Sequence, residues 1–268
     1  MPYLDLPESS HAPGVSPVDI HYRAFGSGTP LIFLHGGWGY EVYPFDRQVA
    51  AFQNQFRILI PDRSGYGHST QVTGDMLLDF HRRAADEAIA FLDALGIERA
   101  ALWGHSDGAV IAAMMGLSAP ERCERLILEA FHFLRKKPGS RAFFERFAAH
   151  PDDLGEETRN LLAQDHGETN WQTVLRRNCA AWFRIADHVR HADEDLYDGR
   201  LGELSVPTLF LHGRLDPRTE PGEMERVREA LPHVWIQFIE NGRHSPHSEE
   251  AAFRECNQIT RQFLAGGS

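Results

Sequence analysis

Short apolar segments alternate with longer amphipathic segments along most of this chain, and this pattern constrains its fold more than any other feature. The apolar segments are rich in aliphatic and β-branched residues, and they cover 31–34, 57–60, 100–103, 126–128, 206–211 and 234–239. Short, nearly continuous apolar runs are typical of strands that are buried on both faces of a parallel sheet. The sequence therefore predicts a parallel sheet at the centre of the fold.

The segments between these runs have the spacing of helices that bury one face. Within 75–95, apolar residues recur every three or four positions, Asp75 stands in the first predicted turn and Gly96 follows as a stop signal. Residues 253–264 repeat the same spacing near the end of the chain. Strands that alternate with helices predict crossover connections and an α/β fold, in which helices flank a mostly parallel central sheet.

The alternation is interrupted at two places, which suggest how the chain is divided. Residues 1–17 are rich in Pro, Ser and Gly and predict an irregular N-terminal lead-in. Residues 131–203 contain no clear strand pattern and predict several helices separated by turns. We therefore expect a core made of 18–130 and 204–268, with 131–203 inserted as a helical cap over the carboxyl edge of the sheet.

The composition restricts the partners and the location that we expect. Of 268 residues, 42% are hydrophobic, and the formal net charge is −11. An acidic surface repels nucleic-acid phosphates and anionic lipid, and no apolar run is long enough to span a bilayer. The three cysteines are scattered, and the first residues lack the basic and apolar parts of a signal peptide. We expect a cytoplasmic protein with reduced thiols and with no nucleic-acid or membrane partner; the sequence does not predict its oligomeric state.

The segment Gly104-His105-Ser106-Asp107-Gly108 follows one predicted strand and precedes a helical pattern of small residues at 109–115. In a Gly-x-Ser-x-Gly turn the chain reverses sharply at the serine, whose backbone is strained. The residues two before and two after the serine approach each other closely, which favours glycine at both. The hydroxyl then stands clear of the sheet at the start of a helix. We predict that Ser106 is a nucleophile.

A second glycine-rich turn, His35-Gly36-Gly37-Trp38-Gly39, follows the predicted strand at 31–34. Backbone N–H groups at such a turn can bind the oxyanion of a tetrahedral intermediate, and each donor is typically worth about 3–4 kcal/mol. We expect the N–H groups of Gly37 and Asp107 to form this oxyanion hole. His35 is expected to brace the loop, and Trp38 either lines the acyl pocket or packs against the core.

A serine nucleophile needs a base within hydrogen-bonding distance, and the base needs an acid to orient it. The chain has 15 histidines, so the candidate base has to be selected by its place relative to the predicted strands. His244 lies between the last predicted strand and the last helix, at the sheet edge where Ser106 is expected. Asp216 follows the penultimate strand and is the expected acid. Glu129, at the end of the strand at 126–128, is the alternative acid.

These segments together resemble the α/β-hydrolase superfamily, in particular members with an inserted helical cap, over residues 18 to 265. The resemblance is carried by His35–Gly39, Pro61–Asp62–Arg63 with Gly65–Ser69, Gly104–Gly108, His212–Asp216 and Gly242–His244. It implies a serine hydrolase with the triad Ser106, Asp216 and His244, in the chain order usual for this fold. The expected reaction is cleavage of a carboxylic ester of a small or medium, partly apolar substrate through an acyl-enzyme.

Two alternatives to an esterase remain at this point. One is a lactonase or C–C bond hydrolase with the same triad, and the other is a receptor-like protein that binds a small molecule with little turnover. The sequence contains no HExxH, P-loop or Gly-x-Gly-x-x-Gly motif, so we expect neither a metal nor an organic cofactor.

The substrate contacts are the least constrained part of the site. The Ser-Asp-Gly sequence of the turn resembles that of valacyclovir-hydrolase-like members, which implies that Asp107 binds a substrate ammonium. Alternatively, Asp107 supplies only its N–H and helps to cap the helix. Phe131 and Trp182 are expected to roof the pocket with other aromatic residues of the cap, although such residues also form cap cores. Lactone-cleaving members of the superfamily resemble this chain in that they carry an acid at the position of Glu129. This resemblance keeps Glu129 as a candidate acid.

Overall fold

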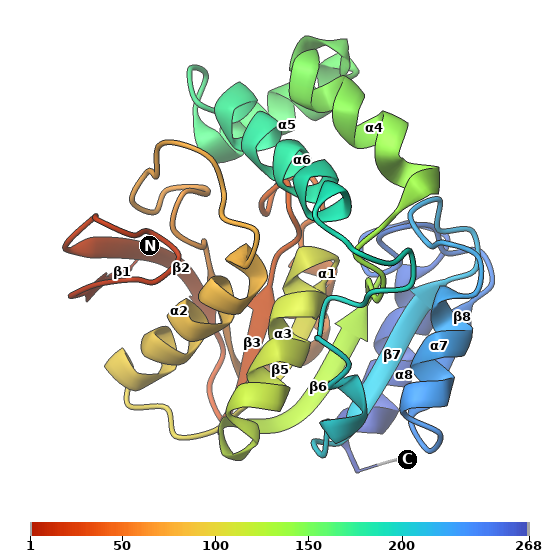
Figure 1. The fold of residues 1–268 in the computed structure, drawn as a ribbon. Coiled ribbons are helices and arrows are strands. Elements are labelled where there is room, and N and C mark those ends of the chain that lie inside the picture. The colour runs from red at the N-terminus through yellow and green to blue at the C-terminus, as the bar shows by residue number, and fades with distance from the viewer. Residues whose placement is uncertain (1, 267–268) are drawn as a thin grey trace.

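A computed structural model describes residues 2–266 of the chain, which form one eight-stranded sheet with helices around it (Figure 1). The strands are β1 (Tyr3–Leu6), β2 (Val18–Phe25), β3 (Thr29–Leu34), β4 (Phe56–Pro61), β5 (Ala100–His105), β6 (Cys123–Glu129), β7 (Thr208–Gly213) and β8 (Trp235–Ile239). The α-helices are α1 (Asp46–Phe52), α2 (Phe80–Ala94), α3 (Asp107–Ser118), α4 (Pro138–Ala149), α5 (Glu156–His166), α6 (Trp171–Asp187), α7 (Glu223–Ala230) and α8 (Phe253–Leu264).

The strand order in the sheet is β1-β2-β4-β3-β5-β6-β7-β8. Strand β2 pairs antiparallel with β1 and β4, whereas every pair from β4 to β8 is parallel. The apolar runs predicted from the sequence form β3 to β8. The predicted α/β fold with a mostly parallel central sheet and flanking helices is therefore confirmed.

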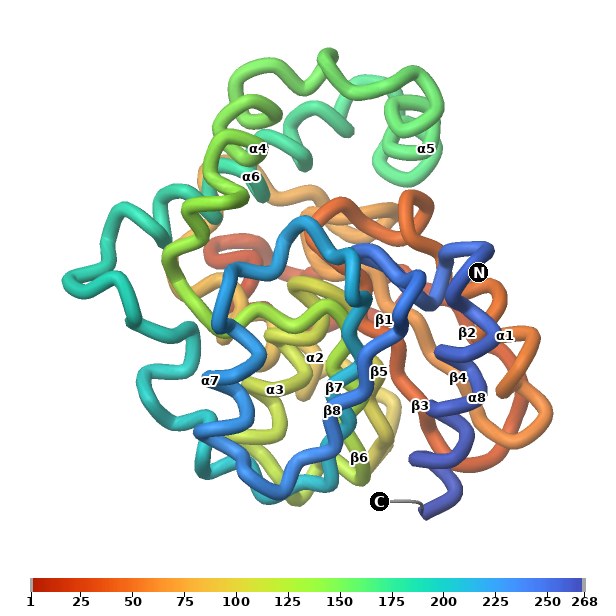
Figure 2. The backbone as a smooth tube through the Cα atoms, turned by 90° about the vertical axis from the view of Figure 1, so that its right-hand side faces the viewer, coloured from red at the N-terminus to blue at the C-terminus, as the bar shows by residue number. Residues whose placement is uncertain are grey.

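Side chains of the central strands alternate between two apolar layers, one on each face of the sheet. Phe33 and Trp103 lie in the layer that contains residues of α1 and α8, while Leu34 and Leu102 lie in the layer that contains residues of α2 and α3. Figure 2 shows these two helix pairs on opposite sides of the strands. Burial on both faces explains why these strands are apolar at almost every position.

Helices α4, α5 and α6 lie between β6 and β7 in the sequence and above one end of the sheet in space (Figures 1 and 2). Helices α4 and α6 contact each other through Phe144 and Trp182, whose rings stack with centroids 5.6 Å apart. The loops that follow the parallel strands open beneath these helices. No helix within residues 2–266 has both the length and the apolar character that crossing a membrane requires.

Two local predictions were wrong. The lead-in at 1–17 was expected to be irregular, but it contains β1, because its backbone pairs with the exposed edge of β2, from Tyr3 opposite His21 to Leu6 opposite Val18. The helix expected over 75–95 begins only at Phe80. Two arginines of α6 bind the segment that precedes α2. Arg177 donates to the carbonyl oxygen of Gly74 at 2.6 Å, and Arg184 donates to that of Met76 at 3.3 Å. These contacts replace the hydrogen bonds of a first helical turn.

Candidate active site

Ser106 lies in a sharp turn between β5 and α3. Its φ of 55° and ψ of −118° are unusual for a residue with a side chain, and the turn holds it there. A Cβ atom on Gly104 would lie 2.1 Å from the carbonyl oxygen of Gly108, and one on Gly108 would lie 2.0 Å from that of Leu34. Only glycine fits at both positions. The predicted spacing of the turn therefore has a steric cause.

Ser106, His244 and Asp216 form a continuous hydrogen-bonded chain. His244 Nε2 lies 3.2 Å from Ser106 Oγ, and His244 Nδ1 lies 3.0 and 3.1 Å from the two carboxylate oxygens of Asp216. Burial alone would raise the pKa of Asp216, but the adjacent His244 and His212 hold that pKa below its ordinary value. The carboxylate therefore stays ionised and keeps the proton of His244 on Nδ1.

Glu129, the alternative acid, does not contact His244. It is fully buried and accepts hydrogen bonds from Trp103 Nε1 at 2.8 Å and from the backbone and ring nitrogens of His247 at 2.9 and 2.8 Å. Burial raises the pKa of Glu129, and His247 and His105 more than offset this effect. Because its carboxylate is occupied by these donors in the core, Glu129 is not positioned to orient His244.

Gly37 and Asp107 line the site, and their N–H groups donate no hydrogen bond to another group among residues 2–266. That of Asp107 belongs to the first turn of α3, where N–H groups have no partner within the helix. The loop that carries Gly37 is braced from behind, because Arg63 donates to the carbonyl oxygens of His35 and Gly36 at 2.5 and 3.0 Å. His35 Nε2 in turn accepts the backbone N–H of Arg63 at 3.2 Å, so His35 braces this loop.

His132 was not predicted, yet its Nε2 lies 3.3 Å from Ser106 Oγ. Its Nδ1 lies 2.9 Å from the ammonium group of Lys137, which is also bound to Glu223 at 2.7 and 2.9 Å. An ammonium group can only donate, so Nδ1 must accept and the ring proton lies on Nε2. Burial, together with the charge of Lys137, holds the pKa of His132 well below 6.5. His132 is therefore a neutral donor to Ser106 Oγ.

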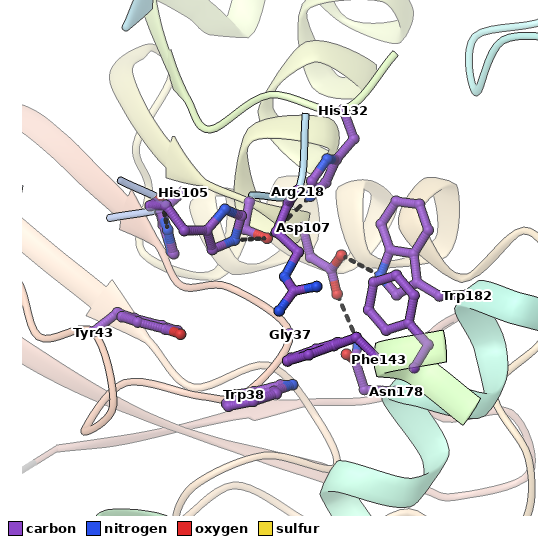
Figure 3. Close-up of a pocket in the computed structure, with 13 residues that line it drawn as sticks. Gly37, Trp38, Tyr43, His105, Asp107, His132, Phe143, Asn178, Trp182 and Arg218 are labelled. Atoms are coloured by element: carbon purple, nitrogen blue, oxygen red, sulfur yellow. Dashed lines mark hydrogen bonds between the residues drawn. The ribbon is translucent and has the colours of Figure 1, made fainter. Parts of the chain in front are cut away.

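These side chains surround a small pocket beneath α4 and α6, with about 410 Å³ of space free of protein atoms, its open mouth included. Figure 3 shows the residues that line it, which are Gly37, Trp38, Tyr43, His105, Ser106, Asp107, His132, Phe143, Phe144, Asn178, Trp182, Arg218 and His244. Trp38 stacks on Phe143 with ring centroids 5.5 Å apart. Trp38 and Trp182 thus line the pocket, and their contact with a substrate stays a prediction.

Phe131, in contrast, is not in the pocket, so its predicted role as a substrate contact was wrong. It is fully buried, stacks on Tyr197 at 5.3 Å and meets Phe210 edge to face at 4.8 Å. The chain turns sharply as it leaves β6, with Ala130 at a φ of 50°. After this turn Phe131 packs into the core, and its neighbour His132 enters the site.

The carboxylate of Asp107 holds the wall of the pocket together. It is buried and accepts hydrogen bonds from Asn178 Nδ2 at 2.7 Å and Trp182 Nε1 at 3.0 Å (Figure 3). It also accepts one from His81 Nε2 at 3.1 Å. Burial raises its pKa, but His81 and the other donors hold that pKa below its ordinary value. The carboxylate therefore joins α2 and α6 to the turn at Ser106 and does not cap α3.

A sequence profile described as the alpha/beta hydrolase fold matches residues 29–183. The chain belongs to the α/β-hydrolase family. It is 31% identical to the pimeloyl-[acyl-carrier protein] methyl ester esterase of Vibrio campbellii, over 92% of this chain and 99% of that protein. It is 23% identical to serine hydrolase BPHL of Homo sapiens, over 93% of this chain and 84% of that protein.

A solved structure extends the likeness to the whole fold. The thermophilic esterase of Thermogutta terrifontis matches with a TM-score of 0.74 and 20% identity, and the match covers 99% of this chain and 98% of that one. Membership of the α/β-hydrolase family confirms the resemblance drawn from the sequence motifs. The relatives are esterases and serine hydrolases, and the predicted hydrolysis of carboxylic esters fits them.

The motifs of the α/β-hydrolase family do not identify every polar residue of this pocket. Tyr43, His132, Asn178 and Arg218 were missed, because each stands in a segment with no motif or periodicity to mark it. Arg218 had one weak signal, since it follows the expected acid by two positions. Within residues 2–266, no cluster of three or more His, Cys, Asp or Glu side chains is arranged to hold a metal ion.

Proposed function

We propose that this protein hydrolyses carboxylic esters of small or medium, partly apolar substrates, with Ser106 as nucleophile, His244 as base and Asp216 as orienting acid. The observation that carries the proposal is the chain of hydrogen bonds from Ser106 Oγ through His244 to Asp216, with distances of 3.2 and 3.0 Å. A serine hydroxyl becomes a strong nucleophile only when such a base can take its proton.

In the acylation step, Ser106 Oγ attacks the ester carbonyl carbon while its proton moves to His244 Nε2. The carbonyl oxygen gains negative charge and is stabilised by the N–H groups of Gly37 and Asp107. Asp216 remains ionised and stabilises the imidazolium. His244 then gives its proton to the alkoxide oxygen of the leaving group as the C–O bond breaks, which leaves Ser106 acylated.

In the deacylation step, a water molecule attacks the same carbonyl carbon while His244 Nε2 takes one of its protons. The same two N–H groups stabilise the second tetrahedral intermediate. When this intermediate collapses, the proton on His244 returns to Ser106 Oγ, and the carboxylic acid product leaves. No step of this cycle requires a cofactor.

His132 supplies a further contact to the reacting oxygen. Its Nε2–H points to Ser106 Oγ at 3.3 Å, so Oγ accepts from His132 while it donates to His244. We assign to His132 the stabilisation of negative charge that develops on Oγ during attack. A neutral donor suits this role, because it cannot compete with His244 for the serine proton.

The size and lining of the pocket support a compact substrate. The space that a water-sized group can occupy in the pocket is about 40 Å³, well below the roughly 300–1,000 Å³ of common ligand pockets, so only a compact group fits beside Ser106. Trp38, Phe143 and Trp182 provide an apolar surface for the acyl or alcohol group. We propose that residues 131–203 act as the cap that sets this specificity, since α4 and α6 supply much of the lining.

Asp107 is proposed to shape the pocket wall in addition to supplying its N–H. A substrate ammonium would have to share this carboxylate with His81, Asn178 and Trp182, which already donate to it. We also propose a cytoplasmic location, in keeping with three free and buried cysteines. A lactonase or C–C hydrolase would use the same triad, so a substrate panel has to separate these activities.

The direct test is hydrolysis of 4-nitrophenyl esters from acetate to octanoate by the native protein and by Ser106→Ala. Loss of the nucleophile should lower kcat by about 10⁴-fold or more. Ser118→Ala is a matched control, because Ser118 lies at the exposed end of α3 and its hydroxyl binds only the carbonyl oxygen of Met114. A fluorophosphonate should label the native protein at Ser106, as located by peptide mass spectrometry.

Equal rates for the native protein and Ser106→Ala would contradict the proposed nucleophile. If the fluorophosphonate labels Ser106 but no simple ester is cleaved, the activity is a more specialised one, and lactones and β-diketones are the next substrates. If Ser106 is neither labelled nor required, a receptor-like binder becomes the better hypothesis.

A further inference from the structure

Arg218 brings a positive charge into the active-site pocket, and its guanidinium has no ion-pair partner among residues 2–266. The residue lies in the loop between β7 and α7 and lines the same pocket as Ser106 and His244 (Figure 3). Its guanidinium carbon lies 3.2 Å from the centroid of the Phe143 ring. Within residues 2–266, this guanidinium makes no ion pair and donates no hydrogen bond to another residue, whereas its backbone N–H binds Asp216 Oδ1 at 2.8 Å.

Within residues 2–266, the two buried arginines are paired. Arg23 donates to Asp62 Oδ1 at 2.7 Å, and Arg63 donates to the carbonyl oxygen of His35 at 2.5 Å. A half-buried guanidinium without such partners is costly, and burial lowers the pKa of Arg218. An anionic group that enters with the substrate would offset this cost.

The acidic groups of the pocket are already committed to other donors. Asp107 accepts hydrogen bonds from α2 and α6, and Asp216 binds His244. The charge of the pocket that remains available to a ligand is therefore the positive charge of Arg218. This holds even though the chain as a whole carries a net charge of −11.

Tyr43 provides a second donor in the pocket that Arg218 lines. Its ring lines the pocket and meets the ring of His244 edge to face, with centroids 6.2 Å apart. In Figure 3 its hydroxyl points toward the centre of the pocket, and within residues 2–266 this hydroxyl makes no hydrogen bond. Burial raises the pKa of Tyr43 to about 12, so the phenol remains protonated and can donate.

We propose that Arg218 and Tyr43 form an anion subsite, and that the natural substrate is an ester that also carries a carboxylate, such as a half-ester of a dicarboxylic acid. The proposal rests on the esterase function proposed above and names its substrate class. A guanidinium fork matches the two oxygens of a carboxylate, and a phenol can donate to one of them. The bound carboxylate would orient the ester carbonyl toward Ser106 Oγ.

The test compares charged and neutral esters of matched length in a pH-stat. Monomethyl succinate, glutarate and adipate are each paired with the methyl ester in which an ethyl group replaces the carboxylate. We expect the native protein to prefer the charged member of at least one pair in kcat/KM. Arg218→Gln should lower the ratio of charged to neutral kcat/KM by about 10- to 100-fold, as expected for loss of a hydrogen-bonded charge pair.

Further variants separate recognition from a structural effect. Arg218→Lys keeps the charge and should give an intermediate ratio, and Tyr43→Phe should lower the ratio by a smaller factor. Arg214→Gln is the matched control, because Arg214 is an exposed arginine of the same loop that pairs with Glu240 and lies outside the pocket. Its ratio should equal that of the native protein.

An Arg218→Gln variant that loses activity on charged and neutral esters alike would overturn the anion subsite, because Arg218 would then only hold Phe143 in place. Calorimetric binding of glutarate tests the subsite without turnover. If no ester is cleaved but glutarate binds and Arg218→Gln abolishes that binding, the subsite stands and the esterase function fails. If neutral esters are cleaved through Ser106 without preference for charge, the esterase stands and the subsite fails.

Discussion

His132 Nε2 lies 3.3 Å from Ser106 Oγ, almost as close as His244 Nε2, which lies at 3.2 Å. Ser106 Oγ therefore contacts two imidazoles with opposite hydrogen-bonding roles. In the proposed mechanism His244 accepts the serine proton on Nε2, because Asp216 keeps the ring proton of His244 on Nδ1. His132 donates to the same oxygen, because Lys137 occupies its Nδ1. The partner of Nδ1 in each ring thus determines whether its Nε2 accepts from or donates to Ser106 Oγ.

Replacing His132 tests this assignment. His132→Ala should lower kcat for 4-nitrophenyl esters by about 10- to 100-fold with little change in KM, because a donor that acts mainly in the transition state is lost. The pH dependence of kcat should keep its shape, since His132 stays neutral across the working range. The exposed His233, in the turn before β8, offers His233→Ala as a control. An unchanged kcat in His132→Ala would show that the contact is structural.

The two candidate acids can be separated by their effects on activity and on stability. Asp216→Asn should lower kcat by about 10⁴-fold, because an amide can no longer keep the proton of His244 on Nδ1. Glu129→Gln should leave kcat per folded molecule within about threefold but lower the free energy of unfolding by about 1–3 kcal/mol, because it weakens a buried hydrogen-bonded group. Kinetics and urea denaturation measure the two effects. A large loss of kcat in Glu129→Gln would restore it as a catalytic acid.

The glycines of the nucleophile turn should not tolerate a methyl group. Gly108→Ala would place Cβ 2.0 Å from the carbonyl oxygen of Leu34, so the turn must shift. We expect it to lower stability by about 1–3 kcal/mol or more and to abolish activity. Gly155→Ala is a suitable control, because Gly155 has a φ of −58° and no atom within 4 Å of the added Cβ. Thermal melting and ester hydrolysis of both variants check this prediction.

Buried neutral histidines should make the fold sensitive to mild acid. Burial, with nearby His247 and His244, lowers the pKa of His105 from 6.5 to about 3. Between these values the unfolded chain binds more protons than the folded one, so the free energy of unfolding falls as the pH falls below 6.5. One such histidine contributes up to about 1.4 kcal/mol per pH unit.

Urea denaturation at several pH values between 7.5 and 4.5 measures this slope. His105→Gln should have a shallower slope than the native protein by up to about one proton, whereas the exposed His233→Gln should not. Equal slopes in the native protein and His105→Gln would mean that His105 becomes protonated in the folded state over this range.

The sequence by itself determined the central sheet and the order of the proposed triad. Strands buried on both faces must be apolar at almost every position, so β3 to β8 are visible as apolar runs. The nucleophile turn is visible for a related reason. Gly104 and Gly108 occupy positions where a Cβ would overlap a backbone oxygen. Because only glycine fits at both positions, the turn can be recognised from the sequence.

Only the tertiary structure decided which side chains meet at the site. Glu129 and Asp216 both follow strands at the same edge of the sheet, but Glu129 is held by Trp103 and His247, and only Asp216 contacts His244. Phe131 was expected in the pocket but lies in the core, and the unpredicted His132 enters the site, because a positive φ at Ala130 sets the direction of the chain. The positions of these side chains depend on contacts between residues far apart in the sequence, and local sequence patterns do not predict such contacts.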